Sequence, residues 1–307
     1  DGVKALMASG RGKASVRVKA IISALTTDAN GSAGDLLVPQ RRPGILAPVT
    51  RRLTVRDLIQ PGRTSGTSIQ YVKESGFTNS AATVSETAGT TKPQSEIKFD
   101  IVTTTVTTLA HWVLATKQIL SDAPQLQSYI NGRLMYGLKS VEEAQLLMGG
   151  GTGTDLNGIY TQATAYSAPI TISGATMIDN LRLALLQAHL AELPPNGMVL
   201  HPSDWTNIEL TKTDDGAYLF SNPTSIVSPT LWGLPVVATQ AMTIDKFLVG
   251  AFNTAAQIFD RWDADILVST EDSDNFRKNL VTILCEERLA LAVYRPEAFI
   301  VGDFGLV

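Results

Sequence analysis

The residues with the most unusual chemistry lie in Asn279–Pro296, which reads NLVTILCEERLALAVYRP. Its β-branched and apolar residues predict a buried β-strand, yet Glu286, Glu287 and Arg288 stand together in its middle. Charged side chains inside a strand need partners, because an unpaired buried charge is costly. A carboxylate kept there without a partner would instead be suited to accepting or donating a proton.

Alternate residues of a strand point to opposite faces, which separates the two glutamates. The odd-numbered residues from Val281 to Val293 are apolar except Glu287, and they predict a face toward the core. The even-numbered face carries Glu286 and Arg288 as neighbours. The residues alone favour a structural interpretation, in which Glu286 pairs with Arg288 and Glu287 binds an arginine elsewhere. The alternative is that one of these carboxylates does chemistry.

Other reactive residue types lack the spacing that chemistry requires. The three histidines (His111, His189 and His201) have no second ligand at metal spacing, so we interpret them as hydrogen-bonded structural residues and expect no metal or cofactor. The single cysteine, Cys285, excludes an intramolecular disulfide. The glycine-rich stretch at 149–158 follows a helix and lacks the Lys-Ser/Thr of a phosphate loop, so it predicts a helix end and a turn.

The elements that must position these residues begin with a long helix. Apolar residues recur at steps of three and four between 126 and 147, Pro124 suits a first turn, and glycines follow. The pattern predicts a helix over about 122–149. At 1.5 Å per residue, such a helix is about 37 Å long, which indicates an elongated body.

A long hairpin is predicted upstream of that helix. Residues 67–72 and 96–113 alternate and are rich in β-branched residues, with a polar segment between them. An isolated hairpin is marginal in water, so these strands are expected to pack on a neighbour. Residues 1–50 are rich in small residues and proline and predict an arm without its own core.

The remainder predicts a mixed subdomain and a second sheet. We expect a helix over 176–193 and further strands at 197–202, 231–240, 246–252 and 255–262. Residues 265–270 and Asn279–Pro296 form the second sheet. The fold class is therefore α+β.

Composition limits the function. The net charge of -4 gives no basic excess for sequence-specific nucleic-acid binding, and no apolar run approaches the length of a membrane span. Only 18% of residues are charged, which indicates either surface hidden in an assembly or a larger interior. We expect a soluble chain made in a reducing cytoplasm.

Four stretches together resemble the tailed-phage major capsid proteins of the Hong Kong 97 fold, and the likeness runs from about residue 35 to 305. They read RRLTVRDLIQPGRTS, LQSYINGRLMYGL, WGLPVV and DNFRKNLVTILCEERLALAVYRP. The resemblance implies an N-terminal arm (1–50), a connection (51–65), an extended hairpin called the E-loop (66–105), a peripheral domain with a long spine helix (106–155 and 260–307) and a mixed α/β axial domain (156–259). Residues 1–24 are either an arm extension or a remnant of a removed scaffold segment.

The resemblance also implies a covalent cross-link between subunits that forms without an enzyme. The lysine before proline falls on Lys92, the target asparagine on Asn279, and the glutamate after cysteine, which promotes the reaction, on Glu286. Trp262 stands where a methionine is expected. Seven residues of extended strand span roughly 23 Å, so Asn279 and Glu286 of one chain cannot easily serve the same bond.

The implied partners follow from shell assembly. They are other copies of the chain in hexamers and pentamers, a portal, a maturation protease and, as a question left open, decoration proteins. The shell would enclose DNA without sequence-specific binding, assemble in the bacterial cytoplasm and have no membrane. A cargo-enclosing nanocompartment of the same fold remains the alternative, whereas an unrelated α/β enzyme has no site to support it.

Overall fold

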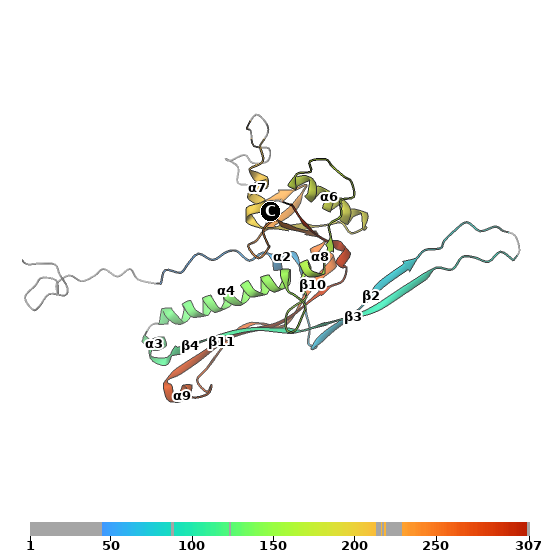
Figure 1. Cartoon of the computed structure of the whole chain (residues 1–307). Coiled ribbons are helices and arrows are strands. Elements are labelled where there is room, and N and C mark those ends of the chain that lie inside the picture. Colours follow the sequence, from blue (N-terminus) through green and yellow to red (C-terminus); the bar gives the residue numbers. More distant parts are fainter. Residues whose placement is uncertain are drawn as a thin grey trace, which may run out of the picture. The chain divides into compact units, whose positions relative to one another are not determined.

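The computed structural model describes residues 45–305, with gaps at 87–88, 123, 213–215, 217 and 219–228. Most of the predicted arm, residues 1–44, lies outside the described residues. The chain divides into two compact units, and residues 47–307 form the second, which carries the elements discussed below (Figure 1). Helices and strands are both well represented, which confirms the α+β class.

A four-stranded sheet carries the strand with the two glutamates. Its order is β1-β10-β11-β4, and the long strands are antiparallel. Its members are β1 (Gln60–Arg63), β4 (Thr107–Thr116), β10 (Ala256–Ser269) and β11 (Leu280–Val293). β10 joins the predicted strands at 255–262 and 265–270 into one, so residues 255–262 belong to this sheet and not to the mixed subdomain.

Helix α4 (Pro124–Met148) covers one face of this sheet and confirms the predicted long helix. Leu134 and Leu138 pack on Val281, Ile283 and Cys285 of β11. α4 ends in a tight turn that requires glycine at 149. A Cβ at this position would lie only 2.2 Å from the Leu156 carbonyl oxygen. The glycine-rich stretch is thus a helix end and turn, as predicted.

The predicted hairpin is shorter than expected at its second strand. β2 (Ser68–Thr78) pairs with β3 (Glu96–Thr105), but residues 107–116 form β4 and leave the hairpin. The Val106 amide donates to the Thr67 carbonyl at 3.0 Å, which closes the hairpin at its root. Beyond that point, Leu109 and Val113 pack under α4, and this burial draws β4 into the sheet.

A six-stranded sheet forms the other part of this unit, in the order β5-β12-β9-β6-β8-β7. Its strands are β5 (Thr164–Ala165), β6 (Gly197–Leu200), β7 (Thr230–Leu231), β8 (Leu234–Ala238), β9 (Lys246–Gly250) and β12 (Phe299–Asp303). The domain prediction groups residues 260–307 with the other sheet, whereas β12 pairs with β9 here.

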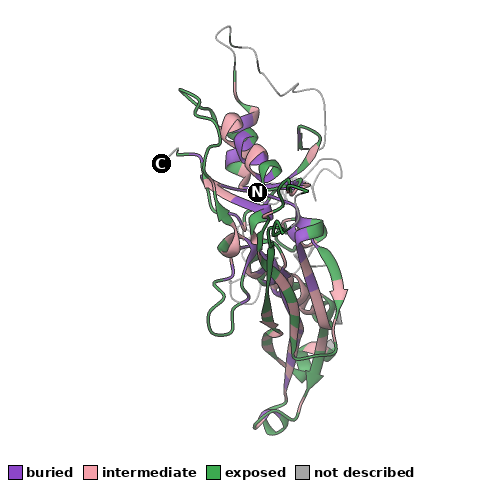
Figure 2. Ribbon diagram, turned by 90° about the vertical axis from the view of Figure 1, so that its right-hand side faces the viewer, coloured by how far each residue is buried: buried purple, intermediate pink, exposed green. Residues whose placement is uncertain are grey.

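Helices α6 (Met177–Leu190) and α7 (Pro202–Glu209) pack on one face of the six-stranded sheet. The opposite face contributes to a core shared with the end of α4 and with β10 and β11. Buried positions are frequent in the packed elements of this unit (Figure 2), whereas most residues of β2 and β3 are exposed. The remaining short helices are α2 (Val55–Leu58), α3 (Lys117–Asp122), α5 (Ile159–Gln162), α8 (Phe252–Ala255), α9 (Asn275–Lys278) and η2 (Pro296–Ala298).

Candidate functional site

The face of β11 that looks toward α4, here called the inner face, holds Glu287 in an ion pair. All odd-numbered residues from Val281 to Val293 are buried, as predicted. Glu287 is 2% exposed, and the Lys139 ammonium lies 2.7 Å from its Oε2. The partner is therefore a lysine and not the expected arginine, because α4 is the element that packs over this face.

Lys139 belongs to a larger charged network beside α4. It also contacts Glu142 at 2.8 Å, and Arg56 pairs with both Glu142 and Asp260. Arg51 lies 2.9 Å from Glu143. The sequence predicts Val141 on the buried apolar face of this helix, which is wrong because Val141 is exposed. The buried positions next to it are taken by Glu142 and Glu143, which pair with these cations. The inner-face charges are thus structural.

The opposite, outer face of the sheet carries Glu286. Strand register places side chains in rows across β4, β11 and β10, and Glu286 lies between Ala110 and Asp265. Glu286 is half-buried and lines a hollow of about 480 Å³. The other residues that line it are Arg261, Trp262, Asp263, Asp265 and Leu267. Among the described residues, the Glu286 carboxylate has no ion-pair or hydrogen-bond partner.

The predicted Glu286–Arg288 pair is wrong. Arg288 lies opposite Trp262 across the strands, and its guanidinium carbon is 4.8 Å from the centre of the indole ring. This is within the range of a cation–π contact. Arg288 is therefore directed to the aromatic ring, and Glu286 is left facing the hollow.

The next row on the outer face is apolar and consists of Trp112, Leu284 and Leu267. Trp112 is 59% exposed and Leu267 47% exposed. A second hollow of about 370 Å³ lies here, also lined by Ser269, Asp272 and Thr282. The outer face thus places a carboxylate beside an uncovered apolar surface, an arrangement that only the strand register reveals.

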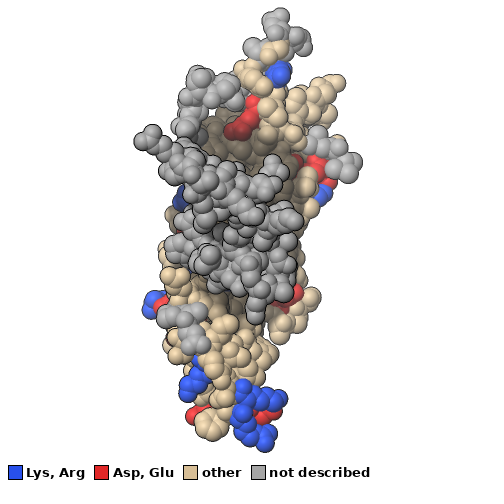
Figure 3. Space-filling model, turned by 90° about the vertical axis from the view of Figure 1, so that its left-hand side faces the viewer, with Lys and Arg blue, Asp and Glu red and all other residues tan. Residues whose placement is uncertain are grey.

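Asn279 lies at the start of β11, at the end of α9. Its backbone has φ 55°, a left-handed conformation that asparagine tolerates well at the end of a helix. The Lys117 amide donates to the Asn279 carbonyl at 2.8 Å and fixes the turn. The side chain is exposed. Figure 3 shows Lys and Arg gathered at this end of the molecule, where α9 contributes Arg277 and Lys278.

Lys92 lies in the loop between β2 and β3 and is exposed. A lysine attacks as the neutral amine, which apolar surroundings favour. None of the described residues of this chain surrounds Lys92 in that way.

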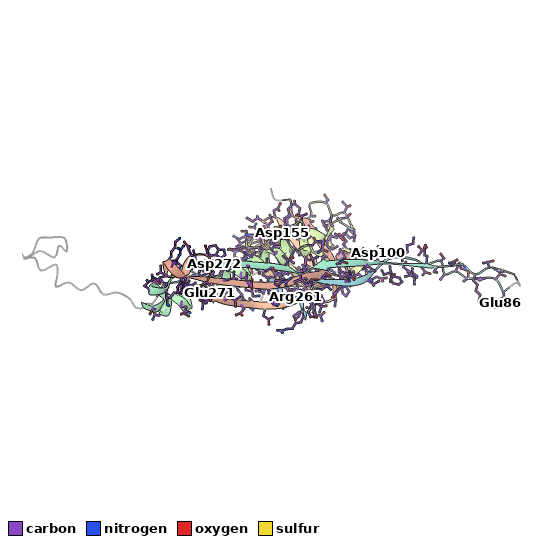
Figure 4. All side chains as sticks on the ribbon, turned by 90° about the horizontal axis from the view of Figure 1, so that it is seen from below. Glu86, Asp100, Asp155, Arg261, Glu271 and Asp272 are labelled. Carbon is purple, nitrogen blue, oxygen red and sulfur yellow. The ribbon has the colours of Figure 1, made fainter. Side chains whose placement is uncertain are left out.

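The structure does not bring Lys92, Asn279 and Glu286 together within one chain. β11 has 14 residues and, at about 3.3 Å each, spans roughly 46 Å. Asn279 directly precedes the first residue of β11. The hairpin contacts the other end of this strand, where the Tyr71 hydroxyl donates to the carbonyl of its last residue, Val293, at 2.9 Å. In Figure 4, Glu86 near the hairpin loop and Glu271 and Asp272 near α9 lie at opposite ends.

One face of the hairpin carries a strip of exposed apolar side chains, interrupted by Glu74 opposite Phe99. Register puts Val72 opposite Ile101 and Phe77 opposite Ile97, with Phe99 between them. All five are between 54% and 72% exposed. The other face carries charged residues, among them Lys98 and Asp100. Such an uncovered apolar strip marks a surface for interaction.

Two of the three histidines have hydrogen-bonded rings as predicted, whereas His189 is exposed in the last turn of α6 and its predicted hydrogen bond stays a prediction. A ring nitrogen of His111 lies 2.8 Å from the Leu134 carbonyl, and His201 accepts from the Ser203 amide at 3.1 Å. The described part of the chain holds no cluster of three or more His, Cys, Asp or Glu residues that would suit a metal. None of its helices is long and apolar enough to cross a membrane.

The chain is similar to known capsid proteins. A family model described as the phage capsid family matches residues 33–304. The chain is also similar to the major capsid protein of Enterobacteria phage HK97, with 50% identity over 286 residues, which cover 93% of this chain and 74% of that protein.

Solved structures of low sequence identity share the fold. The capsid of an empty GTA particle aligns with a TM-score of 0.74 at 19% identity, over 91% of this chain and 98% of that one. A chain from Microbacterium phage Oxtober96 aligns with a TM-score of 0.74 at 14% identity, over 90% of this chain and 99% of that one.

Proposed function

This chain belongs to the phage capsid family, and we propose that it is the major capsid protein of a tailed double-stranded DNA phage, assembling into an icosahedral head. The observation that carries this proposal is the 50% identity to a major capsid protein over 93% of the chain. The exposed apolar strip of the hairpin agrees with it, because a capsid subunit buries such surface against other copies.

We further propose that mature shells are stabilised by an isopeptide bond between Lys92 and Asn279 of different subunits. The separation of the two residues within one chain supports a bond between copies. Since Glu286 lies about 23 Å along β11 from Asn279, it is the Glu286 of a further subunit that serves each bond. The site then exists only in the assembled shell, and free subunits do not join covalently.

The chemistry needs no cofactor. The Lys92 ammonium gives a proton to Glu286, and the neutral amine attacks the Asn279 side-chain carbonyl carbon. A carbon–nitrogen bond to Lys92 forms, the protonated Glu286 gives its proton to the original amide nitrogen, and the bond to that nitrogen breaks so that it leaves as ammonia. The attacking nitrogen then gives its second proton to the Glu286 carboxylate, which leaves a neutral isopeptide bond. The apolar row at Leu284 would keep water from the attacking amine.

The assembled setting follows from the same proposal. The arm, the hairpin and the sheet edges make the contacts. Assembly takes place in the bacterial cytoplasm with a portal and a maturation protease. The net charge of -4 suits a container that encloses DNA without gripping it.

The test is a denaturing gel of boiled, matured particles. Wild-type shells should give a ladder of high-mass species, and the ladder should vanish in Lys92→Ala, Asn279→Asp and Glu286→Ala. Asn279→Asp is informative because a carboxylate is a poor acyl donor to an amine. A single monomer band from mature wild-type shells would refute the cross-link while leaving shell formation intact.

A further inference from the structure

Among the described residues, the two arginines close to Glu286 make other contacts. Arg261 lines the same hollow, but its Nη1 donates to the Gly66 carbonyl at 3.1 Å. Arg288 shares the outer face two residues along the strand, and its guanidinium stacks on Trp262. Asp265 lies opposite Glu286 on β10, and its Oδ1 accepts a hydrogen bond from the Ile266 amide at 2.8 Å.

Arg288 is the cation with most reason to pair with Glu286. Same-face neighbours on a strand are within reach of a long side chain, and a guanidinium forms strong paired hydrogen bonds with a carboxylate. The Nε of Arg288 is nevertheless buried without a hydrogen-bond partner in the described structure. The indole ring of Trp262 therefore holds the Arg288 guanidinium away from the Glu286 carboxylate.

From this geometry we propose that Trp262 is a positioning residue for cross-linking, because it holds Arg288 and thereby keeps the Glu286 carboxylate free to act as a base. This inference rests on the proposed role of Glu286. A carboxylate bound to a guanidinium has its lone pairs occupied and its charge compensated, so it accepts a proton less readily. Trp262 acts through Arg288 and does not touch the reacting atoms.

Loss of the ring should release Arg288 onto Glu286. In Trp262→Ala particles, we expect cross-linking to slow by about tenfold, a part of the roughly 10²–10⁴-fold that a general base supplies. Trp262→Phe keeps an aromatic face for the guanidinium and should stay close to the wild-type rate. Removing the released cation as well, in Trp262→Ala/Arg288→Met, should restore the rate to within about twofold of Arg288→Met alone.

The experiment follows the loss of monomer on denaturing gels during maturation of complete particles, with particle formation checked by electron microscopy. Trp232→Ala is the matched control, since Trp232 is 47% exposed against 49% for Trp262 and also lies against an arginine, Arg182, at 5.8 Å. This control should cross-link at the wild-type rate, because Trp232 lies on the six-stranded sheet side of the chain.

The outcomes separate the two proposals. Restoration of the rate in the double variant supports the positioning role, because a purely structural tryptophan would not be rescued by a second truncation. A wild-type rate in Trp262→Ala, or a double variant as slow as the single one, overturns the positioning role alone, provided that Glu286→Gln remains inactive. A wild-type particle without any cross-link overturns both proposals.

Discussion

Glu286 and Glu287 are adjacent in sequence but lie in opposite environments. Glu287 is on the inner face, almost fully buried and paired with Lys139. Glu286 is on the outer face, half-buried beside an open hollow, and without a partner among the described residues. The period of two in a strand makes this difference, because consecutive side chains meet a helix on one side and solvent on the other.

The partners of a buried carboxylate therefore decide whether its role is structural. The inner-face carboxylate belongs to a network that fastens α4 and the segment around Arg51 and Arg56 to the sheet. The outer-face carboxylate makes no ion pair or hydrogen bond with the described residues. It is therefore the one with freedom to serve a reaction between subunits.

Replacement of Glu286 should have the largest effect, on the rate of cross-linking. Glu286→Gln should slow cross-linking by about 10²–10⁴-fold, because the amide cannot accept the lysine proton. Its particles should assemble normally. The rate of monomer loss on denaturing gels measures this, and a Glu286→Gln shell that cross-links like wild type would remove the distinction.

The second effect concerns stability. Lys139→Met leaves Glu142 and Glu287 buried without this cation, and breaking a buried pair costs about 3–5 kcal/mol, with the lower value expected for a lysine that is 31% exposed. Denaturant unfolding of dissociated subunits measures it. The control is Lys98→Met, whose pair with Glu96 is exposed and should matter by less than about 1 kcal/mol. Equal losses of stability in both variants would show that the buried pairs of Lys139 contribute no more than an exposed pair.

A smaller effect tests the uncovered surface of the hairpin. Phe99→Ser should weaken assembly by about 1–3 kcal/mol per contact while leaving the unfolding of free subunits unchanged, because Phe99 is 63% exposed in the chain alone. The protein concentration at which shells form gives this value. Asp100→Ser, on the opposite face of the same strand, is the control and should assemble nearly as wild type.

The smallest effect reports how well the inner face is sealed. Burial, followed by the neighbouring Glu287 charge, raises the pKa of the Cys285 thiol. Since the thiolate is the reactive form, Cys285 should resist iodoacetamide at mildly alkaline pH in folded subunits and react once they unfold. Mass spectrometry measures the labelling, and rapid labelling of folded subunits would show that the inner face opens.

The sequence predicted the long helix, the hairpin and the two faces of β11 because each follows from a local period. It failed where tertiary contacts decide. The run 96–113 gave no sign of its break at Val106, which depends on a hydrogen bond to Thr67. Likewise, only the packing of α4 gives Glu287 a lysine partner, and only the register of β10 places Trp262 against Arg288.

The candidate site divides in the same way. The resemblance points to Lys92, Asn279 and Glu286, and the spacing along the strand predicts that Asn279 and Glu286 of one chain cannot easily serve the same bond. The apolar row of Trp112, Leu284 and Leu267 could not be read from the sequence, since its members come from three strands.

A bond between subunits can be tested directly with particles assembled from two variants together. A Lys92→Ala chain offers only Asn279, and an Asn279→Asp chain offers only Lys92. Co-assembled and matured, they should give a covalent dimer of one chain of each kind and nothing larger, whereas each variant alone gives only monomer. A mixed particle that contains only monomer would contradict a bond between Lys92 and Asn279 of different subunits.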